Sequence, residues 1–377
     1  MESRGRILGT TEEAATAMDL NLRTAVWSLS GKKKNVFWMA QYILASDDWL
    51  TLNLRIYYAL RAFKLIYYPT LAVVAVPVNT VTIVILSRGK CGLAKGVTRY
   101  LVAMAATDLM VVFMDVILRK IPIAYRDYFG FVRSIRVCDV HAFLLYTATD
   151  CSVWFTVTFT FDRFVSICCQ KLKTNYCTER TALVVLGTVT ALSCLKNIFW
   201  CFMLTSEYSL AYARWFCMPR ARLLESQIWG SIELLHYILT PIIPFILVLL
   251  FNALTIRHVL VASRARRRLR APSSGEGAHD PEMASRRKSL ILLLVISGNF
   301  ILLWALFILY YIWNRMRFLG YLSMFPPAPL RELCFMMQLL SCCTNTALYA
   351  VTQTRFRDQL KDVVKSPFIL ISKRIHC

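Results

Sequence analysis

Two opposite charges stand side by side in an otherwise apolar and aromatic stretch of the chain, FTFDRFVSICC at residues 159–169. Charged side chains are costly in apolar surroundings unless they are paired. Asp162 and Arg163 can pair with each other at low cost, and a binding partner can separate them. The pattern favours a reversible ion pair, although a single Asp-Arg dipeptide also fits an ordinary anchor at a membrane interface.

A carboxylate lies inside a second apolar stretch, LVAMAATDLMVVFMDV, where Asp115 follows Asp108 on the same helical face. An intramembrane carboxylate normally faces the interior of a helix bundle or a water-filled cavity. Helix order brings Ser152, Ser341 and Asn345 near Asp108, and such oxygen ligands suit a small hard cation. These residues predict an allosteric sodium site, with a structural contact between helices as the alternative. We expect no other metal and no cofactor.

The cysteines carry a third signal. The chain has 13 of them, most in apolar segments or on the expected inner side, where thiols stay reduced. Cys138 and Cys217 instead fall on the expected outer side, where they are placed to form one disulfide that tethers a loop over the mouth of a helix bundle. Cys201 is the competing partner, at the expected membrane edge.

A set of apolar helices must position these residues. The 377 residues are 57% hydrophobic and only 18% charged, with a mean hydropathy of +0.51, whereas soluble chains are about a quarter charged. A helix needs about 20 apolar residues to cross the hydrocarbon layer. The sequence predicts an all-α membrane protein with a seven-transmembrane helix bundle. The predicted spans are 65–86, 101–118, 142–161, 181–204, 234–256, 290–313 and 333–351.

Charge indicates the orientation. The net charge is +22, and more than half of the 44 Lys and Arg residues fall between or after the spans on one side. Positive residues concentrate on the cytoplasmic side, so we expect a multi-pass plasma-membrane protein with an extracellular N-terminus, whose first span serves as its insertion signal. Contact with anionic lipid head groups accounts for most of the excess charge, and nucleic-acid binding is not expected.

The remaining segments complete the predicted organisation. Residues 1–64 form an extracellular tail, 65–353 the bundle, and 263–289 a mobile, basic cytoplasmic loop within it. In 354–377, Phe356, Leu360, Val363 and Val364 share one helical face. This pattern predicts a short amphipathic helix along the membrane surface, followed by a cytoplasmic tail.

Over residues 67–360, this combination resembles a rhodopsin-class (class A) G-protein-coupled receptor. The spacing from Cys138 to Arg163 is that of the family's third helix. Other positions match the family's first, second, fifth, sixth and seventh helices: Asn79, Asp108, Pro244, Phe300 with Trp304, and Asn345 with Tyr349 in NTALY.

The chain also departs from that pattern. Asp-Arg-Phe replaces the usual Asp-Arg-Tyr, and Leu306 and Thr346 stand where helices six and seven normally carry a proline. Losing a proline removes a kink. Finer features, including DVILRKIP and LSCLKNIFW, resemble a small orphan receptor subgroup whose better-studied members respond to the aromatic amino acids tryptophan and phenylalanine.

The resemblance implies a mechanism. Asp162 holds Arg163 at rest, and activation frees the arginine to meet a heterotrimeric G protein at an opened cytoplasmic face. The implied coupling and switch residues are Asp162, Arg163, Phe164, Asn252, Phe300, Trp304, Asn345 and Tyr349.

The outer half is expected to bind an extracellular ligand, a small molecule such as an aromatic amino acid or, alternatively, a peptide. Such an amino acid needs a ring slot, an anion for its amine and a cation for its carboxylate. Asp150 or Glu233 is predicted to supply the anion, and Arg119 or Lys120 the cation. The aromatic residues also fit simple helix packing. The full predicted set is Arg119, Tyr146, Asp150, Glu233, His236, Tyr237, Trp304, Phe307, Tyr311 and Phe335.

Two other classes of membrane protein fit less well. A transporter or channel would need internal repeats, interrupted spans or a pore-lining series of charges, and the sequence shows none. An enzyme would need a catalytic set within the bundle, whereas the five His residues lack metal-ligand spacing. The sequence therefore predicts a receptor without enzymatic activity.

Overall fold

The computed structural model describes residues 49–208, 216–220, 227–269, 281–318, 321–324 and 326–375. The chain divides into two units, Met1–Lys64 and Leu65–Cys377. Every site considered below lies in the second unit. Most of the predicted extracellular tail lies outside the described residues.

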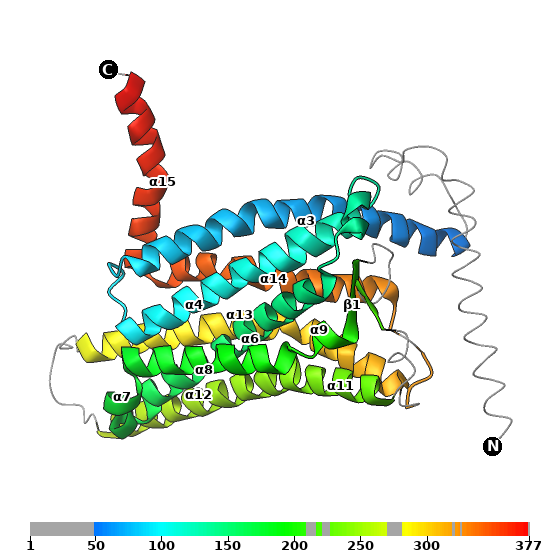
Figure 1. Cartoon of the computed structure of the whole chain (residues 1–377). Helices are drawn as coiled ribbons and strands as arrows, with labels where there is room; N and C mark the ends of the chain where they lie inside the picture. The colour runs from blue at the N-terminus through cyan, green and yellow to red at the C-terminus, as the bar shows by residue number, and fades with distance from the viewer. Residues whose placement is uncertain are drawn as a thin grey trace. The chain divides into compact units, whose positions relative to one another are not determined.

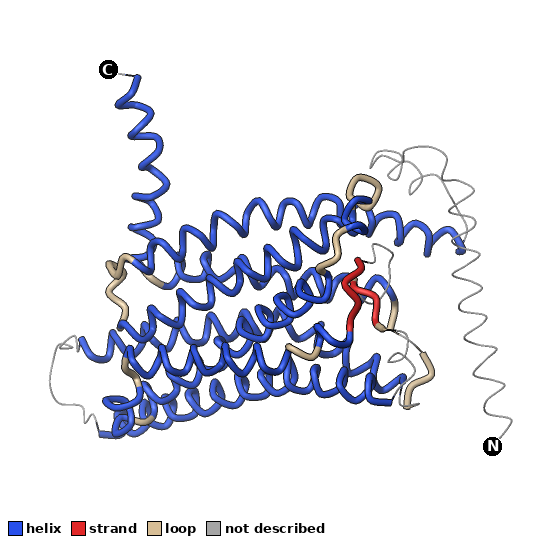
Figure 2. The backbone as a smooth tube through the Cα atoms, in the orientation of Figure 1, coloured by secondary structure: helices blue, strands red, loops and turns tan. Residues whose placement is uncertain are grey.

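Long helical segments lie side by side in the second unit (Figures 1 and 2). Two of the segments change helix type along their length, α4 through the π-helix η1 into α5, and α11 through the π-helix η3 into α12. The long segments are α3 (Trp49–Ser87), α4 (Lys95–Val111) with η1 (Val112–Lys120) and α5 (Ile121–Ala124), α6 (Cys138–Cys168), α8 (Glu179–Asn197) with α9 (Trp200–Met203), α11 (Gln227–Tyr237) with η3 (Ile238–Ile242) and α12 (Ile243–Leu269), α13 (Pro281–Phe318), and α14 (Ala328–Thr352).

Shorter elements connect or extend them. The remaining elements are η2 (Gly130–Ser134), α7 (Gln170–Tyr176), the strands β1 (Leu204–Tyr208) and β2 (Cys217–Pro219), and α15 (Thr354–Ile375). The two strands pair antiparallel, with Tyr208 opposite Cys217, and form a hairpin at the end of the bundle where α6 begins (Figure 1).

Within the part of the chain that the structure describes, six helical segments are long and apolar enough to cross a membrane. They are Ala59–Ser87, Lys95–Ala124, Glu179–Met203, Leu234–Arg264, Ser289–Arg317 and Pro329–Thr352. Each contains most or all of one predicted span. The one predicted span that is not among these six is 142–161, the third in chain order, which lies within α6. Helix α6 is 31 residues long but carries Asp150 and several Thr residues in its middle. These polar residues lower its hydropathy, so α6 is not among the six.

Helix α6 is the centre of the bundle. It packs against α4, α8, α12 and α13, and its buried positions include Asp150, Asp162 and Arg163 beside apolar residues. A helix that is buried on several sides meets little lipid. This location explains how α6 can carry polar side chains that a lipid-exposed helix could not.

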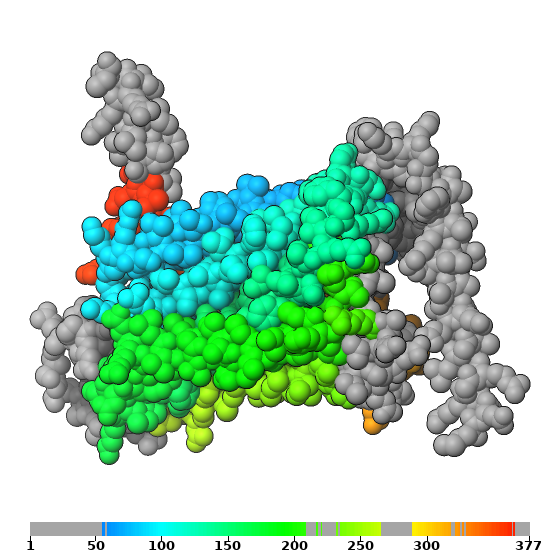
Figure 3. Space-filling view, in the orientation of Figure 1, coloured from blue at the N-terminus to red at the C-terminus, as the bar shows by residue number. Residues whose placement is uncertain are grey.

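Helix α8 shows the opposite distribution. Its apolar side chains Leu183, Val184, Leu192 and Leu195 are 49%, 62%, 60% and 70% exposed. The face seen in Figure 3 is formed largely by α4 and α8, in cyan to green. Apolar surface of this extent is unusual for a soluble monomer and marks an interaction with a partner or a membrane.

Two helices are unbroken at the positions where the family's prolines are missing, as the sequence predicts. Helix α13 passes Leu306 and α14 passes Thr346 without an internal break. On α14, the Thr346 hydroxyl hydrogen-bonds the Thr82 hydroxyl of α3 at 2.6 Å between oxygens. In the fifth long segment, the irregular backbone lies at Thr240, before Pro241, and not at the family-like Pro244, which lies within α12.

Helix α15 begins where the predicted amphipathic segment begins. It turns away from the direction of α14 (Figure 1, red). Phe356 is fully buried, and its ring lies 5.9 Å from that of Tyr349 in α14. The partly buried side chains of Leu360 and Val363 pack against the same core, so three of the four predicted apolar positions contact the bundle. The Val364 side chain lies outside the described residues.

Candidate functional site

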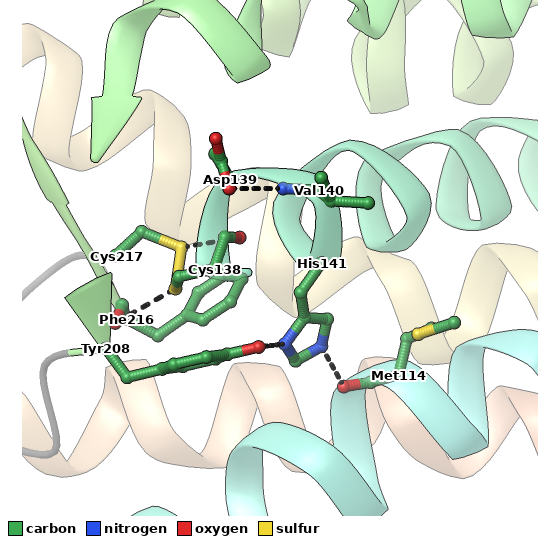
Figure 4. Close-up of a disulfide and its surroundings, with 8 residues drawn as sticks. All are labelled: Met114, Cys138, Asp139, Val140, His141, Tyr208, Phe216 and Cys217. Carbon is green, nitrogen blue, oxygen red and sulfur yellow. Dashed lines mark hydrogen bonds between the residues drawn. A yellow bond between two sulfur atoms is a disulfide. The ribbon is translucent and has the colours of Figure 1, made fainter. Parts of the chain in front are cut away.

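The disulfide between α6 and the hairpin is the predicted one. Cys138, at the first residue of α6, is bonded to Cys217, at the first residue of β2 (Figure 4). The competing Cys201 is a free thiol. The bond therefore ties the hairpin to the start of the central helix.

His141 reinforces this attachment (Figure 4). Its Nε2 lies 2.8 Å from the carbonyl oxygen of Met114 and its Nδ1 lies 3.1 Å from the hydroxyl of Tyr208 in β1. Because a carbonyl oxygen only accepts, Nε2 carries the proton, and Nδ1 accepts from Tyr208 when the ring is neutral. Burial and the nearby Asp139 carboxylate raise the pKa of Tyr208 and keep its hydroxyl a donor. The hairpin is thus bonded to α6 through both a disulfide and a histidine.

Asp108 is held by side chains from two other helices. Ser152 Oγ in α6 donates to Asp108 Oδ1 at 2.7 Å, and Asn345 Nδ2 in α14 donates to Asp108 Oδ2 at 2.7 Å. Asp108 is 2% exposed. Ser341, the fourth predicted member, instead donates to the carbonyl of Gln338 in its own helix at 2.6 Å. The structure brings together three of the four predicted residues.

Each Asp108 oxygen accepts one hydrogen bond and keeps a further lone pair, but Asn345 turns its Nδ2 and not its Oδ1 toward the carboxylate, so a cation would gain that amide oxygen as a ligand only if the amide rotated. Within the described ranges, no group of three or more His, Cys, Asp and Glu side chains is placed to hold a metal ion.

The C-terminal part of α6 carries the Asp162–Arg163 ion pair. Arg163 Nε donates to Asp162 Oδ2 at 3.0 Å, and its Nη2 contacts the same oxygen. The two residues are 2% and 8% exposed. Arg163 Nη1 also donates to Ser289 Oγ of α13 at 3.4 Å. A single guanidinium therefore pairs with its neighbouring carboxylate and links α6 to α13.

Three other predicted switch residues make contacts of their own. Phe164 stacks on Phe251 with ring centroids 5.8 Å apart. Asn252 Oδ1 accepts from Ser297 Oγ at 2.9 Å, which joins α12 to α13. Tyr349 is buried against Phe356, and its hydroxyl has no hydrogen-bond partner among the described residues.

Most of the predicted pocket aromatics lie close together in the bundle. Trp304 contacts Phe300 below it and Phe307 above it, with ring centroids 5.4 and 5.9 Å away. Phe307 also meets Tyr311 at 5.7 Å and Phe335 of α14 at 5.3 Å. Tyr237 packs against Tyr311 and against His236. The rings form one continuous cluster between α11, α13 and α14.

The predicted cationic partner for a ligand is already paired. Arg119 donates through Nε and Nη2 to the two oxygens of Asp115, at 2.7 and 3.0 Å. Its guanidinium also lies over the ring of Phe216, 5.2 Å from the centroid. Lys120 Nζ lies 4.4 Å from the centre of the Phe335 ring.

The predicted anionic partner is also paired. Lys196 Nζ and Asn197 Nδ2, both from α8, donate to Asp150 Oδ2 at 2.8 and 2.5 Å. Lys196 Nζ donates further to Thr240 Oγ1 at 2.9 Å. The side chain of Glu233, the other predicted anion, lies outside the described residues.

Comparison with protein families decides the class. Residues 78–349 match the model of the family 7 transmembrane receptor (rhodopsin family). The match covers well over half of the chain. The chain belongs to the rhodopsin family of seven-transmembrane receptors.

This membership fixes the broad class. The receptor is a multi-pass, all-α membrane protein, and the apolar surface of α8 has a lipid environment to face. Rhodopsin-family proteins are receptors and not enzymes as a class, and their general partners are an extracellular ligand and a G protein. The ligand of this receptor is a separate question.

Lys196 is the residue of the receptor that the sequence interpretation overlooked. It lies inside the predicted span 181–204, where an ionisable residue normally faces the bundle interior and pairs. The rule that singled out Asp108 applies equally to Lys196. Which residues Lys196 pairs with depends on how three helices are rotated about their axes. The sequence alone gave no indication that Asp150 and Thr240 would be those partners.

Proposed function

We propose that this receptor binds an extracellular ligand in its outer half and activates heterotrimeric G proteins by opening its cytoplasmic face. The main support for the proposal is the contact among Asp162, Arg163 and Ser289. In it, the Arg163 guanidinium bonds Asp162 and links α6 to α13 through Ser289. A buried, paired arginine at the inner end of the central helix is a resting arrangement.

Activation follows from population shift. An agonist moves the equilibrium only by its preference for the active conformation. Moving the inner end of α13 away from α6 breaks the Arg163–Ser289 contact at 3.4 Å. The freed guanidinium can then leave Asp162 and meet backbone carbonyls at the C-terminal helix of a Gα subunit. Phe164 and Asn252 line the same inner region.

The same proposal includes the full topology. Helix α6 also spans the membrane, as the third span in chain order, which brings the total to seven. Its length and its central position support this. The Cys138–Cys217 disulfide and the hairpin mark the extracellular end, and the Asp162–Arg163 pair marks the cytoplasmic end. The N-terminus is then extracellular in a plasma-membrane protein, and α15 lies along the cytoplasmic surface.

For the ligand, we propose a small aromatic amino acid-like molecule. The ring cluster around Trp304, Phe307 and Tyr311 supports a ring-binding site, and the resemblance to the orphan subgroup points the same way. A peptide remains the second candidate because the charged outer loops, with the exposed Arg136–Glu207 pair, present polar groups to a longer ligand.

We also propose that Asp108 binds an allosteric sodium ion. Ser152 and Asn345 place hydroxyl and amide groups on the Asp108 carboxylate, and a rotation of the Asn345 amide would present its oxygen instead of its nitrogen. Oxygen ligands of this kind suit sodium.

Nucleotide exchange on purified Gα tests the proposed function. The purified receptor should accelerate GTPγS binding, and Arg163→Ala should abolish the acceleration because the guanidinium is the proposed contact with Gα. Arg136→Ala is the matched control, since it removes an exposed arginine at the outer face. Full exchange activity of Arg163→Ala at equal receptor concentration would contradict the proposal.

A further inference from the structure

Three segments of the chain meet at Asp162. The Cys177 thiol, in the turn between α7 and α8, donates to the backbone carbonyl of Asp162 at 3.5 Å. A Cβ atom added at Gly96, in the first turn of α4, would lie 3.2 Å from the carbonyl oxygen of Thr178, so α4 runs directly against the same turn. The start of α4 and the turn between α7 and α8 therefore lie beside the C-terminal part of α6.

Tyr100 lies on this part of α4 and is fully buried. Its exposure is 0%, and its ring meets the ring of Phe159 in α6 edge-on, with centroids 6.4 Å apart. Phe159 precedes Asp162 by three residues, and residues at this spacing are neighbours on a helix surface. Among the charged groups around the Tyr100 hydroxyl, Asp162 acts on it most strongly. The hydroxyl is therefore within electrostatic reach of the Asp162 carboxylate.

The Tyr100 hydroxyl has no hydrogen-bond partner among the described residues. Leaving a buried donor unsatisfied costs free energy, and native proteins keep few such groups. The Asp162 carboxylate has room for a further donor, because both hydrogen bonds from Arg163 go to Oδ2 and neither goes to Oδ1. An unsatisfied hydroxyl thus lies near a carboxylate whose present partner is the arginine of the proposed switch.

We infer that Tyr100 becomes the hydrogen-bond partner of Asp162 when Arg163 leaves it. In the resting receptor, the guanidinium compensates the carboxylate and the Tyr100 hydroxyl makes no bond. In the active receptor, Arg163 contacts Gα and the Tyr100 hydroxyl donates to the Asp162 carboxylate. Tyr100 is thus a positioning residue of the switch, and this inference rests on the proposed receptor function.

The change of partner favours the active state for two reasons. Removing one member of a buried ion pair leaves an uncompensated charge, which is strongly unfavourable, and Asp162 is only 2% exposed. A hydrogen bond to an ionised acceptor is stronger than one between neutral groups, so the hydroxyl lowers that cost. The same bond satisfies a donor that is unsatisfied in the resting state.

Tyr176, at the end of α7, carries another hydroxyl near this carboxylate. Burial, Asp162 and Cys177 raise the pKa of Tyr176, so its hydroxyl stays protonated and able to donate. Tyr176 is only half-buried, however, whereas Tyr100 is fully buried. A hydroxyl that reaches water can be satisfied in both states and gains less from the freed carboxylate. This difference in burial assigns the role to Tyr100.

The test is basal GTPγS exchange on purified Gα by the full-length receptor with Tyr100→Phe, which keeps the ring against Phe159 and removes only the hydroxyl. The exchange rate should fall about tenfold, because the active state loses a hydrogen bond to a charged group. The unfolding midpoint should not fall, since the resting state loses no bond. In an Asp162→Ala receptor, Tyr100→Phe should leave the exchange rate unchanged because the acceptor is absent.

Tyr68→Phe is the matched control. The Tyr68 hydroxyl is also buried without a partner among the described residues, and it should leave the exchange rate unchanged when removed. If Asp162→Ala does not fold, Asp162→Asn replaces it, and its neutral oxygen should reduce the effect of Tyr100→Phe to about twofold.

Three results would overturn the inference. They are a wild-type exchange rate for Tyr100→Phe, a lower unfolding midpoint for that variant, and an equal slowing by Tyr100→Phe in wild type and in the Asp162 variant. A wild-type receptor without any exchange activity would instead overturn the proposed function, on which the role of Tyr100 depends.

Discussion

At the scale of single residues, Asp162 determines where the Arg163 charge rests. We expect Asp162→Asn to raise basal GTPγS binding several-fold, because an amide holds a guanidinium less tightly than a carboxylate does. Ser289→Ala should raise it less, since that hydroxyl is neutral and its oxygen lies 3.4 Å from Arg163 Nη1. An unchanged basal rate for Asp162→Asn, at matched receptor levels, would contradict the role of the ion pair.

Asp108 gives a second prediction at this scale. Sodium should raise the unfolding midpoint of wild type, and Asp108→Asn should eliminate this response because the formal charge that attracts the ion is gone. Ser152→Ala should weaken it. Ser341→Ala should not, since the Ser341 hydroxyl bonds its own helix at the Gln338 carbonyl. A sodium response of Asp108→Asn equal to that of wild type would rule out the ion site.

At the scale of elements, Phe356 is the side chain that fastens α15 to the bundle. It is fully buried against Tyr349, and removing a buried aromatic ring from a packed core costs about 3–5 kcal/mol. We expect Phe356→Ala to lower the unfolding midpoint and to increase hydrogen exchange in residues 354–365. Arg357→Ala, at an exposed neighbouring position, is the control. If both variants behave alike, the packing of α15 is not what the structure indicates.

Across the whole molecule, the disulfide and the membrane orientation can be checked together. An epitope at the N-terminus should be detected on intact cells, and one at the C-terminus only after permeabilisation. Cys138→Ser should strongly reduce the amount of receptor at the surface, because losing a native disulfide typically costs about 2–5 kcal/mol. Cys201→Ser should not, since Cys201 is a free thiol. An N-terminal epitope hidden on intact cells would overturn the proposed orientation.

Most of the fold could be predicted from the sequence because the length of an apolar stretch is a local property of the chain. Each of six predicted spans overlaps a helix that is long and apolar enough for a membrane, and the seventh predicted span lies in α6. The Cys138–Cys217 pairing was also predicted, since few cysteines fall on the expected outer side. The positions at which helices begin were predicted less accurately. Helix α3 begins at Trp49 and α13 at Pro281, well before the apolar stretches that start at residues 65 and 290.

The candidate site was predictable only in part. Asn345 and Ser152 meet Asp108 as helix order suggested, but Ser341 does not. Asp150 and Arg119 were predicted as ligand partners, yet Lys196 and Asp115 already pair with them. Which side chains face each other across a bundle depends on the rotation and height of each helix. Both are set by packing between distant segments.

The amino-acid sequence by itself determined that this chain has membrane-spanning helices, basic segments between them and an Asp-Arg pair at one helix end, because hydropathy, charge and adjacency are properties of neighbouring residues. Only the tertiary structure decided that Lys196 lies between Asp150 and Thr240. The physical reason is distance along the chain: these three residues come from three helices, and no local pattern fixes the geometry in which they meet.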